Sequence, residues 1–305
     1  MNNLHPLIKR AALGLLALPL FMLSNIAQAN DFPTAAPEEV GVSSDRLQRL
    51  SNTMQRYIDS NMLAGTVSLV SRNGKVIHVE SQGWKNKETG EQMTDDSIFV
   101  IMSMTKPIVS AALMMLYEEG HFLLTDPITD WIPELEGKQV VIEENGVNYR
   151  MSAHRPITFR HVLSHTAGVD PSREVLTEEE LALLPRKATL EETLINRASL
   201  PLSFHPGDDW QYGSSTDYVA LLVERISGLP LVDFLQEKIL NPLQMHDTSY
   251  IVPKDKIDRV AAVYSPSGPD QTIELFRAPE FRETTYFGGV AGLSSTVSDY
   301  WRFSQ

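Results

Sequence analysis

Cysteine is absent from the 305-residue sequence, and positively charged residues are outnumbered by negatively charged ones. Without cysteine the chain has neither a disulfide framework nor the lipid-attachment cysteine of a lipoprotein. Lysine and arginine number 26 against 39 aspartate and glutamate, which gives a formal charge of −13 at pH 7. So acidic a balance argues against nucleic-acid binding, and we interpret the charge as a solvated acidic surface.

The sequence also lacks internal repeats, a low-complexity linker, a P-loop and a G-x-G-x-x-G nucleotide motif. Hydrophobic residues make up 42% and charged residues 21%, which is ordinary for a soluble enzyme. The length suits one large domain or two closely joined ones, and it allows a sizeable core. We expect no cofactor, because no cofactor-binding motif is present.

The first 29 residues differ from the rest. Lys9 and Arg10 precede an apolar run at 11–23, and Ala27 and Ala29 then form an A-x-A pattern. This order predicts a signal peptide that is cleaved after Ala29, and therefore a periplasmic or secreted protein. The alternative is an N-terminal membrane anchor, but the run is short for a span of about 20 residues. We expect no stable membrane span after cleavage.

Local patterns predict strands first and helices later. Asn-Gly pairs at 73–74 and 145–146 each separate two strand-like runs, which predicts two hairpins. Ser44 is predicted to cap an early helix, and helical apolar spacing marks a second one at 103–116, with Gly120 as its stop. Helices are also predicted in four later stretches, at 158–169, 177–186, 189–200 and 215–228.

Ser103 and Lys106 in "SMTK" are three residues apart, and no other S-x-x-K occurs in the chain. Residues at this spacing share one face of a helix, so the lysine can reach the serine hydroxyl. Serine needs a base to become a nucleophile, and a desolvated lysine can supply one. The alternative is a capping serine beside a solvated lysine, which the motif alone does not exclude.

A second element, "YGS", contains Tyr212 and Ser214, and it is the chain's one Y-x-[NS] match. A tyrosine near a lysine can act as a phenolate base or as a proton donor to a leaving group. Ser214 could relay a hydrogen bond. The alternative for Tyr212 is a buried aromatic ring whose hydroxyl is bonded to the backbone.

The two motifs and their flanks resemble the serine β-lactamase-related hydrolases, which include class C-type β-lactamases, DD-peptidases and family VIII carboxylesterases. "SMTK" looks like the family's first motif and "YGS" like its second, usually Y-x-N. The stretches "TDPITDWIPE", "PITFRHVLSHTAGV" and "GGVAGLSSTVSDYWRF" are similar in the same order, from about residue 38 onward. The resemblance implies an α/β (α+β type) β-lactamase/transpeptidase-like fold, in which helices flank an antiparallel sheet beside a mostly helical part.

The resemblance also implies roles for individual residues. Ser103 would be the nucleophile, Lys106 its base partner and Tyr212 the acid/base, with water hydrolysing the acyl-enzyme. Ser214 stands where many members have asparagine, which implies a substrate-binding or relay role. We expect the hydroxyls of Ser103 and Tyr212 and the Lys106 amine to converge in one cleft. One oxyanion donor would be the backbone N–H of Ser103.

The implied substrate is a small-molecule ester, an amide or a peptidoglycan-like compound. "YGSSTD" looks more like the esterase-type members, which favours a carboxylesterase over a β-lactamase or DD-peptidase. The alternative function is that of a non-catalytic truncated relative, such as a penicillin- or peptidoglycan-binding pseudoenzyme. Fold-level analogy does not choose between substrates.

The sequence departs from the family at its third motif, K-T-G, H-x-G or W-x-G, which lies near the C-terminus in other members. None follows Tyr212; His205-Pro206-Gly207 matches the letters but precedes that tyrosine, so we regard it as a coincidence. Thr296 and Asp299 suggest a capping box for a helix that stops at Gln305. We therefore expect that C-terminal strands are missing and that the sheet is incomplete.

On this interpretation the chain divides into a signal peptide at 1–29 and one domain at 30–305. Residues 30–125 and 285–305 would form the sheet-bearing part, and residues 126–284 the mostly helical part.

Two further features have weaker interpretations. His161 and His165 are spaced as in a zinc-binding helix, but Val162 stands where a metalloprotease has glutamate, so no metal site is expected. Three aromatic residues, Trp131, Trp210 and Tyr286, either line a substrate cleft or fill the core, and the core is the default for aromatic residues.

Overall fold

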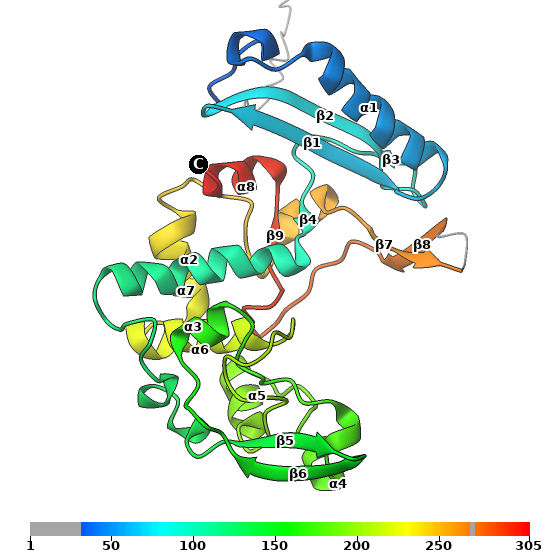
Figure 1. Cartoon of the computed structure of the whole chain (residues 1–305). Coiled ribbons are helices and arrows are strands. Elements are labelled where there is room, and N and C mark those ends of the chain that lie inside the picture. Colours follow the sequence, from blue (N-terminus) through cyan, green and yellow to red (C-terminus); the bar gives the residue numbers. More distant parts are fainter. Residues whose placement is uncertain (1–31, 269–271) are drawn as a thin grey trace, which may run out of the picture. The chain divides into compact units, whose positions relative to one another are not determined.

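The computed structural model describes residues 32–268 and 272–305 (Figure 1). The predicted signal peptide lies outside the described residues. The contacts reported below lie within the unit Pro33–Gln305. Among the described residues, no helix is both long enough and apolar enough to cross a membrane.

The largest sheet has three strands in the order β1-β2-β3. β1 (Gly65–Arg72) and β2 (Lys75–Asn86) are antiparallel and joined by Asn73-Gly74, and β3 (Glu91–Gln92) pairs with the end of β2. Asn73 and Gly74 have φ values of 54° and 70°, the left-handed backbone that a two-residue hairpin turn requires. The predicted first hairpin is therefore confirmed.

Helix α1 (Ser44–Asp59) packs against β2, and the C-terminal helix α8 (Val297–Phe303) contacts β1 (Figure 1). The predicted cap of α1 is wrong by one residue. Ser43 is the N-cap, because its hydroxyl accepts a hydrogen bond from the N–H of Arg46, whereas Ser44 donates its own hydroxyl to Glu38. Adjacent serines both satisfy the sequence rule for a cap, so the pattern alone does not choose between them.

The core lies around α2 (Thr105–Glu118) and α6 (Ser215–Ser227), which pack against each other. Ile108, Leu113 and Leu222 are fully buried at this contact layer. Burial of such side chains is worth about 1.5–3 kcal/mol each, which holds the start of α2 in a fixed place. Gly120, with φ of 83°, follows the end of α2 as predicted.

Shorter helices surround this pair, and the four predicted later helices are present. They are α3 (Phe159–Leu163), α4 (Glu178–Leu181), α5 (Leu190–Arg197) and α6, whereas α7 (Leu231–Leu235) was not predicted. Single-turn 3₁₀ and π segments complete the set: η1 (Pro37–Val40), η2 (Met102–Met104), η3 (Ile128–Asp130), η4 (Pro133–Leu135), η5 (Arg173–Val175), η6 (Gln236–Leu240) and η7 (Lys254–Arg259).

Two separate hairpins lie outside the main sheet. β5 (Gln139–Glu144) and β6 (Val147–Ser152) turn on Asn145-Gly146, which confirms the second predicted hairpin. β7 (Val263–Ser267) and β8 (Thr272–Arg277) form a third one that the sequence pattern did not predict. Proline within a run argues against a strand, yet Pro266 is accommodated opposite Ile273 in this two-stranded ribbon.

The C-terminal segment joins the rest through a short antiparallel pair. β4 (Phe99–Val100) pairs with β9 (Ser294–Ser295) directly before η2 and α8. Thr296 caps α8 by accepting from the N–H of Asp299, which is one half of the predicted capping box. The Asp299 carboxylate accepts hydrogen bonds from Asp247 N and Thr248 Oγ1, so it ties the start of α8 to that distant segment.

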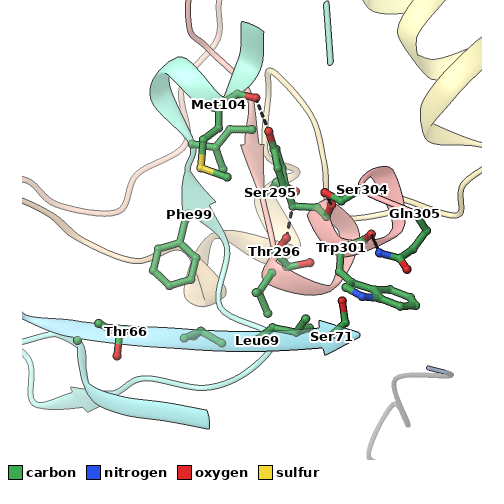
Figure 2. Close-up of a pocket in the computed structure, with 15 residues that line it drawn as sticks. Thr66, Leu69, Ser71, Phe99, Met104, Ser295, Thr296, Trp301, Ser304 and Gln305 are labelled. Carbon is green, nitrogen blue, oxygen red and sulfur yellow. Dashed lines mark hydrogen bonds between the residues drawn. The ribbon is translucent and has the colours of Figure 1, made fainter. Parts of the chain in front are cut away.

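β1 forms one end of the main sheet in the described structure, and a cavity of about 610 Å³ lies between this strand and α8. Figure 2 shows Leu69 and Ser71 of β1 facing Thr296 and Trp301 of the α8 segment. Met104, next to Ser103 in sequence, also lines this cavity. β7, β8 and β9 pair with one another or with β4, so none of them extends the main sheet beyond β1 in the part of the chain that the structure describes.

Candidate active site

Ser103 lies in η2, the single turn that precedes α2, and its side chain is exposed. The residue before it, Met102, has φ of 46°, a left-handed conformation that is uncommon for a residue with a side chain. Such strained backbone persists where the surroundings enforce it, and it is concentrated at functional sites. The fold therefore presents Ser103 at the surface on a constrained turn.

Lys106 stands one turn later, in the first turn of α2, and its side chain is 8% exposed. Its Nζ donates hydrogen bonds to Ser103 Oγ and to the backbone carbonyl of Val290, each at 3.0 Å. Pro107 follows at a position where a helix has no acceptor for the N–H that proline lacks. The i, i+3 spacing thus produces the predicted contact.

Tyr212 comes from the loop before α6 and reaches the same point. The Nζ of Lys106 lies 4.6 Å from the centre of the tyrosine ring. Hydrogen bonds with the Lys106 side chain, and then with Ser103, lower the pKa of Tyr212 from its usual value of 10.0. The convergence of Ser103, Lys106 and Tyr212 is confirmed, while their catalytic roles stay predictions.

Ser214 is held by a carboxylate that the sequence analysis did not single out. Its hydroxyl donates to Asp170 Oδ1 at 2.6 Å, and its backbone N–H donates to Asp170 Oδ2 at 2.7 Å. Charge-assisted bonds of this kind are stronger than neutral ones, so they fix the loop that carries Tyr212. This contact positions Ser214, and the predicted relay or substrate-binding role stays a prediction.

The middle residue of the motif, Gly213, has a steric reason to be glycine. A methyl group at this position would lie 2.1 Å from Asp170 Oδ2, much closer than atoms pack in proteins. The Asp170 carboxylate can therefore approach the backbone of Ser214 because Gly213 has no side chain.

His165 supports the same loop. Its backbone carbonyl accepts from the N–H of Gln211 at 2.9 Å, and its Nδ1 accepts from the N–H of Gly213 at 3.5 Å. Its ring lies 4.9 Å from the Tyr212 ring. Burial and then the charge of Lys106 lower the pKa of His165, so the ring is neutral at neutral pH.

The other histidine of the pair, His161, accepts from the N–H of Thr158 through Nδ1 and so caps α3. Within residues 32–268 and 272–305, no group of three or more His, Cys, Asp or Glu side chains could hold a metal ion. His205 of the H-x-G string stacks on His154, with ring centres 3.6 Å apart.

Asp217, in the first turn of α6, fixes the segment whose carbonyl contacts Lys106. Its Oδ1 accepts from the N–H of Val290, and its Oδ2 accepts from the hydroxyl of Tyr286, each at 3.0 Å. The carbonyl of Val290 is the one that accepts from Lys106. The signal in the sequence was an acid in the first turn of a largely apolar helix, but its partner lies 73 residues away.

Comparisons with known proteins agree with this geometry. The family model described as "Beta-lactamase" matches residues 50–305. The chain belongs to the β-lactamase family. The resemblance inferred from "SMTK" and "YGS" is thereby confirmed, as is the α/β fold class.

Two relatives at about 30% identity match most of this chain. Protein Rv1367c of Mycobacterium tuberculosis is 32% identical over 255 residues, which are 82% of this chain and 64% of that protein. Esterase EstB of Burkholderia gladioli is 30% identical over 278 residues, which are 83% of this chain and 68% of the esterase. The chain thus spans about two thirds of the length of these relatives.

Among solved structures, EstCE1, "a hydrolase with promiscuous acyltransferase activity", superimposes with a TM-score of 0.69 at 24% identity. The match covers 84% of this chain and 70% of that one. At this level of identity the match shows a shared fold.

The contacts of Asp170 predict effects of different size for two substitutions, at Asp170 and at Ser214. We expect Asp170→Ala to slow acylation of Ser103 at least about tenfold, because both anchors of the Tyr212 loop are lost and one charge-assisted bond is worth about 1.5–3 kcal/mol. Ser214→Ala should have a smaller effect, because its backbone N–H keeps its acceptor. The labelling rate of Ser103 by a fluorophosphonate measures both; equal rates in all three proteins would contradict the positioning role.

Proposed function

We propose that the protein is a serine hydrolase that cleaves an ester through an acyl-enzyme on Ser103. The observation that carries the proposal is the hydrogen bond from the buried ammonium of Lys106 to Ser103 Oγ, at 3.0 Å. A hydroxyl in contact with such a group, on a strained exposed turn, is arranged as an activated nucleophile. The activity, substrates and partners of the whole protein are part of this proposal.

The lowered pKa of Tyr212 indicates how the base works. As a phenolate stabilised by Lys106, Tyr212 takes the Ser103 proton while Oγ attacks the ester carbonyl. The tetrahedral intermediate collapses when the alcohol leaves with that proton. Water then attacks the acyl-enzyme and gives its proton to Tyr212, which passes it to Ser103 Oγ as the bond from the acyl carbon to Oγ breaks and the acid is released. The backbone N–H of Ser103 is the candidate donor to the oxyanion.

Two features support an ester, rather than a β-lactam or peptidoglycan, as the substrate. The relative EstB is named an esterase. The second feature is Ser214, whose hydroxyl is already bonded to Asp170 rather than free to contact a substrate amide. A carboxylesterase therefore remains our leading proposal, with acyl transfer to another alcohol as the same chemistry with a different acceptor.

Covalent labelling tests the nucleophile. A fluorophosphonate should modify Ser103, and Ser103→Ala should abolish the modification while the control Ser60→Ala leaves it unchanged. Lys106→Ala should slow labelling by about 10²–10⁴-fold, because the group that activates the hydroxyl is gone. Intact mass and peptide mapping give the readout. An unmodified Ser103 in the folded wild-type protein would favour the non-catalytic alternative.

The pH profile tests Tyr212. Its deprotonated form is the base, so kcat/KM for an ester should rise with pH and level off above an inflection that lies below 10. The lowered pKa of His165 places that group below about 6.5, so the two titrations are separable. Tyr212→Phe should remove the upper inflection and lower kcat/KM by about 10²–10⁴-fold. The same profile in both proteins would show that another group is the base.

We also propose that the protein acts in the periplasm or outside the cell, on the basis of the pattern in residues 1–29. Expression in a Gram-negative host should yield a protein that begins at Asn30 outside the cytosol. The double substitution Leu15→Arg and Leu16→Arg interrupts the apolar run and should leave residues 1–29 attached in the cytosol. A cytosolic wild-type protein with its first 29 residues intact would contradict export.

A further inference from the structure

A second cavity, of about 400 Å³, adjoins the candidate active site along the chain. Its lining includes Met102 and Ala291. Met102 precedes the nucleophile Ser103, and Ala291 follows Val290, whose carbonyl accepts from Lys106. A substrate acylating Ser103 could therefore extend into this cavity.

The charged lining of the cavity is mainly cationic. Three arginines reach it from separate segments: Arg186 from the loop before α5, Arg277 from the end of β8, and Arg282 from the chain that follows. Glu280 and Glu283 also line it, and Glu280 pairs with Arg282. Three guanidinium groups against two carboxylates leave a positive excess, in a protein whose formal charge is −13.

Arg277 has an unsatisfied donor. Its Nη2 atom is buried and has no hydrogen-bond partner among the described residues. Burial and then the nearby guanidinium of Arg282 lower the pKa of Arg277, against a smaller opposite effect of Glu280. A buried donor without a partner costs free energy, which an anion that reaches it from the cavity would recover.

Arg186 lines the same cavity and could bind the same anion as Arg277. Its guanidinium lies 4.0 Å from the centre of the Tyr286 ring, a stacked contact that leaves the N–H groups at its edge available. The Tyr286 ring is itself fixed through its hydroxyl, which donates to Asp217. Asp217 also holds the N–H of Val290, so the stacked arginine and the active-site carbonyl share one anchor.

We propose that this cavity is a subsite for a carboxylate on the ester substrate, bound by Arg277 and Arg186. The planar fork of arginine matches a carboxylate with two hydrogen bonds. Apolar residues such as Val100, Ile257 and Val260 make up the walls, which suits a short aliphatic chain between the carboxylate and the scissile carbonyl. The substrate class is thus the monoester of a short dicarboxylic acid. This inference rests on the proposed function of Ser103.

A pair of esters of equal chain length tests the subsite. Mono-p-nitrophenyl glutarate carries the carboxylate, and p-nitrophenyl valerate carries a methyl group in its place. Arg277→Gln should lower kcat/KM for the glutarate ester about 10- to 100-fold, the size expected for one lost charge-assisted interaction. The valerate ester should change less than about twofold. Arg173→Gln, at an exposed arginine outside the cavity, is the matched control and should change neither.

Hydrolysis of the valerate ester also shows whether a variant is still folded, because this ester does not need the subsite. If Arg277→Gln lowers both rates, Arg186→Gln provides the second comparison, because that side chain is exposed on a different segment. An equal loss with both esters in both variants would overturn the subsite, as would a glutarate rate that neither substitution changes.

Binding separates this inference from the proposed function. In Ser103→Ala, calorimetric titration should show that glutarate binds and that the neutral diamide glutaramide does not, and Arg277→Gln should abolish the binding. Glutarate binding without Ser103-dependent hydrolysis would keep the subsite and reject the esterase. Hydrolysis of valerate without glutarate binding would keep the esterase and reject the subsite. Stronger binding of inorganic phosphate than of glutarate would overturn the assignment to a carboxylate.

Discussion

The buried ammonium of Lys106 is the constraint on which the rest of the site depends. A cation with 8% exposure is costly unless its protons are hydrogen-bonded. Ser103 Oγ and the Val290 carbonyl accept from it, and the Tyr212 ring lies against it. These three groups belong to separate parts of the chain. The ammonium is therefore stable only when all three segments are assembled, which couples folding of the core to assembly of the site.

The position of the segment that carries Val290 depends on a glycine without a side chain as well as on hydrogen bonds. A methyl group at Gly289 would lie 2.0 Å from the carbonyl oxygen of Thr216, so this backbone can approach α6 only with glycine. The close approach lets Asp217 accept from the N–H of Val290. Leu293 N then donates to Thr105 Oγ1, in the first turn of α2. Together these contacts hold α2, α6 and the 286–293 segment as one unit.

Rules for turns and for helical spacing correctly predicted the features that depend on residues close together in the sequence. The Asn-Gly turns at 73–74 and 145–146 and the contact between Ser103 and Lys106 follow from φ preferences and helical spacing, so the sequence revealed them. Asp170 was not predicted, because its contact with Ser214 spans 44 positions and no short motif encodes it. The β7–β8 hairpin was missed because tertiary context tolerates Pro266 in a strand. Family resemblance supplied the meeting of Tyr212 with Lys106, which periodicity does not give.

The charge around the second cavity is opposite in sign to that of the whole chain, and this contrast determines how the arginines can act. Electrostatic fields are screened over about 8 Å at physiological ionic strength, so a distant anion meets the acidic surface and gains nothing from Arg277. Long-range steering is thereby excluded as the use of these cations. In the subsite that we propose, they would act by contact on groups already inside the cavity. The proposed subsite would discriminate among substrates by contact, because only an anion that fits the cavity would meet the unpaired donor of Arg277.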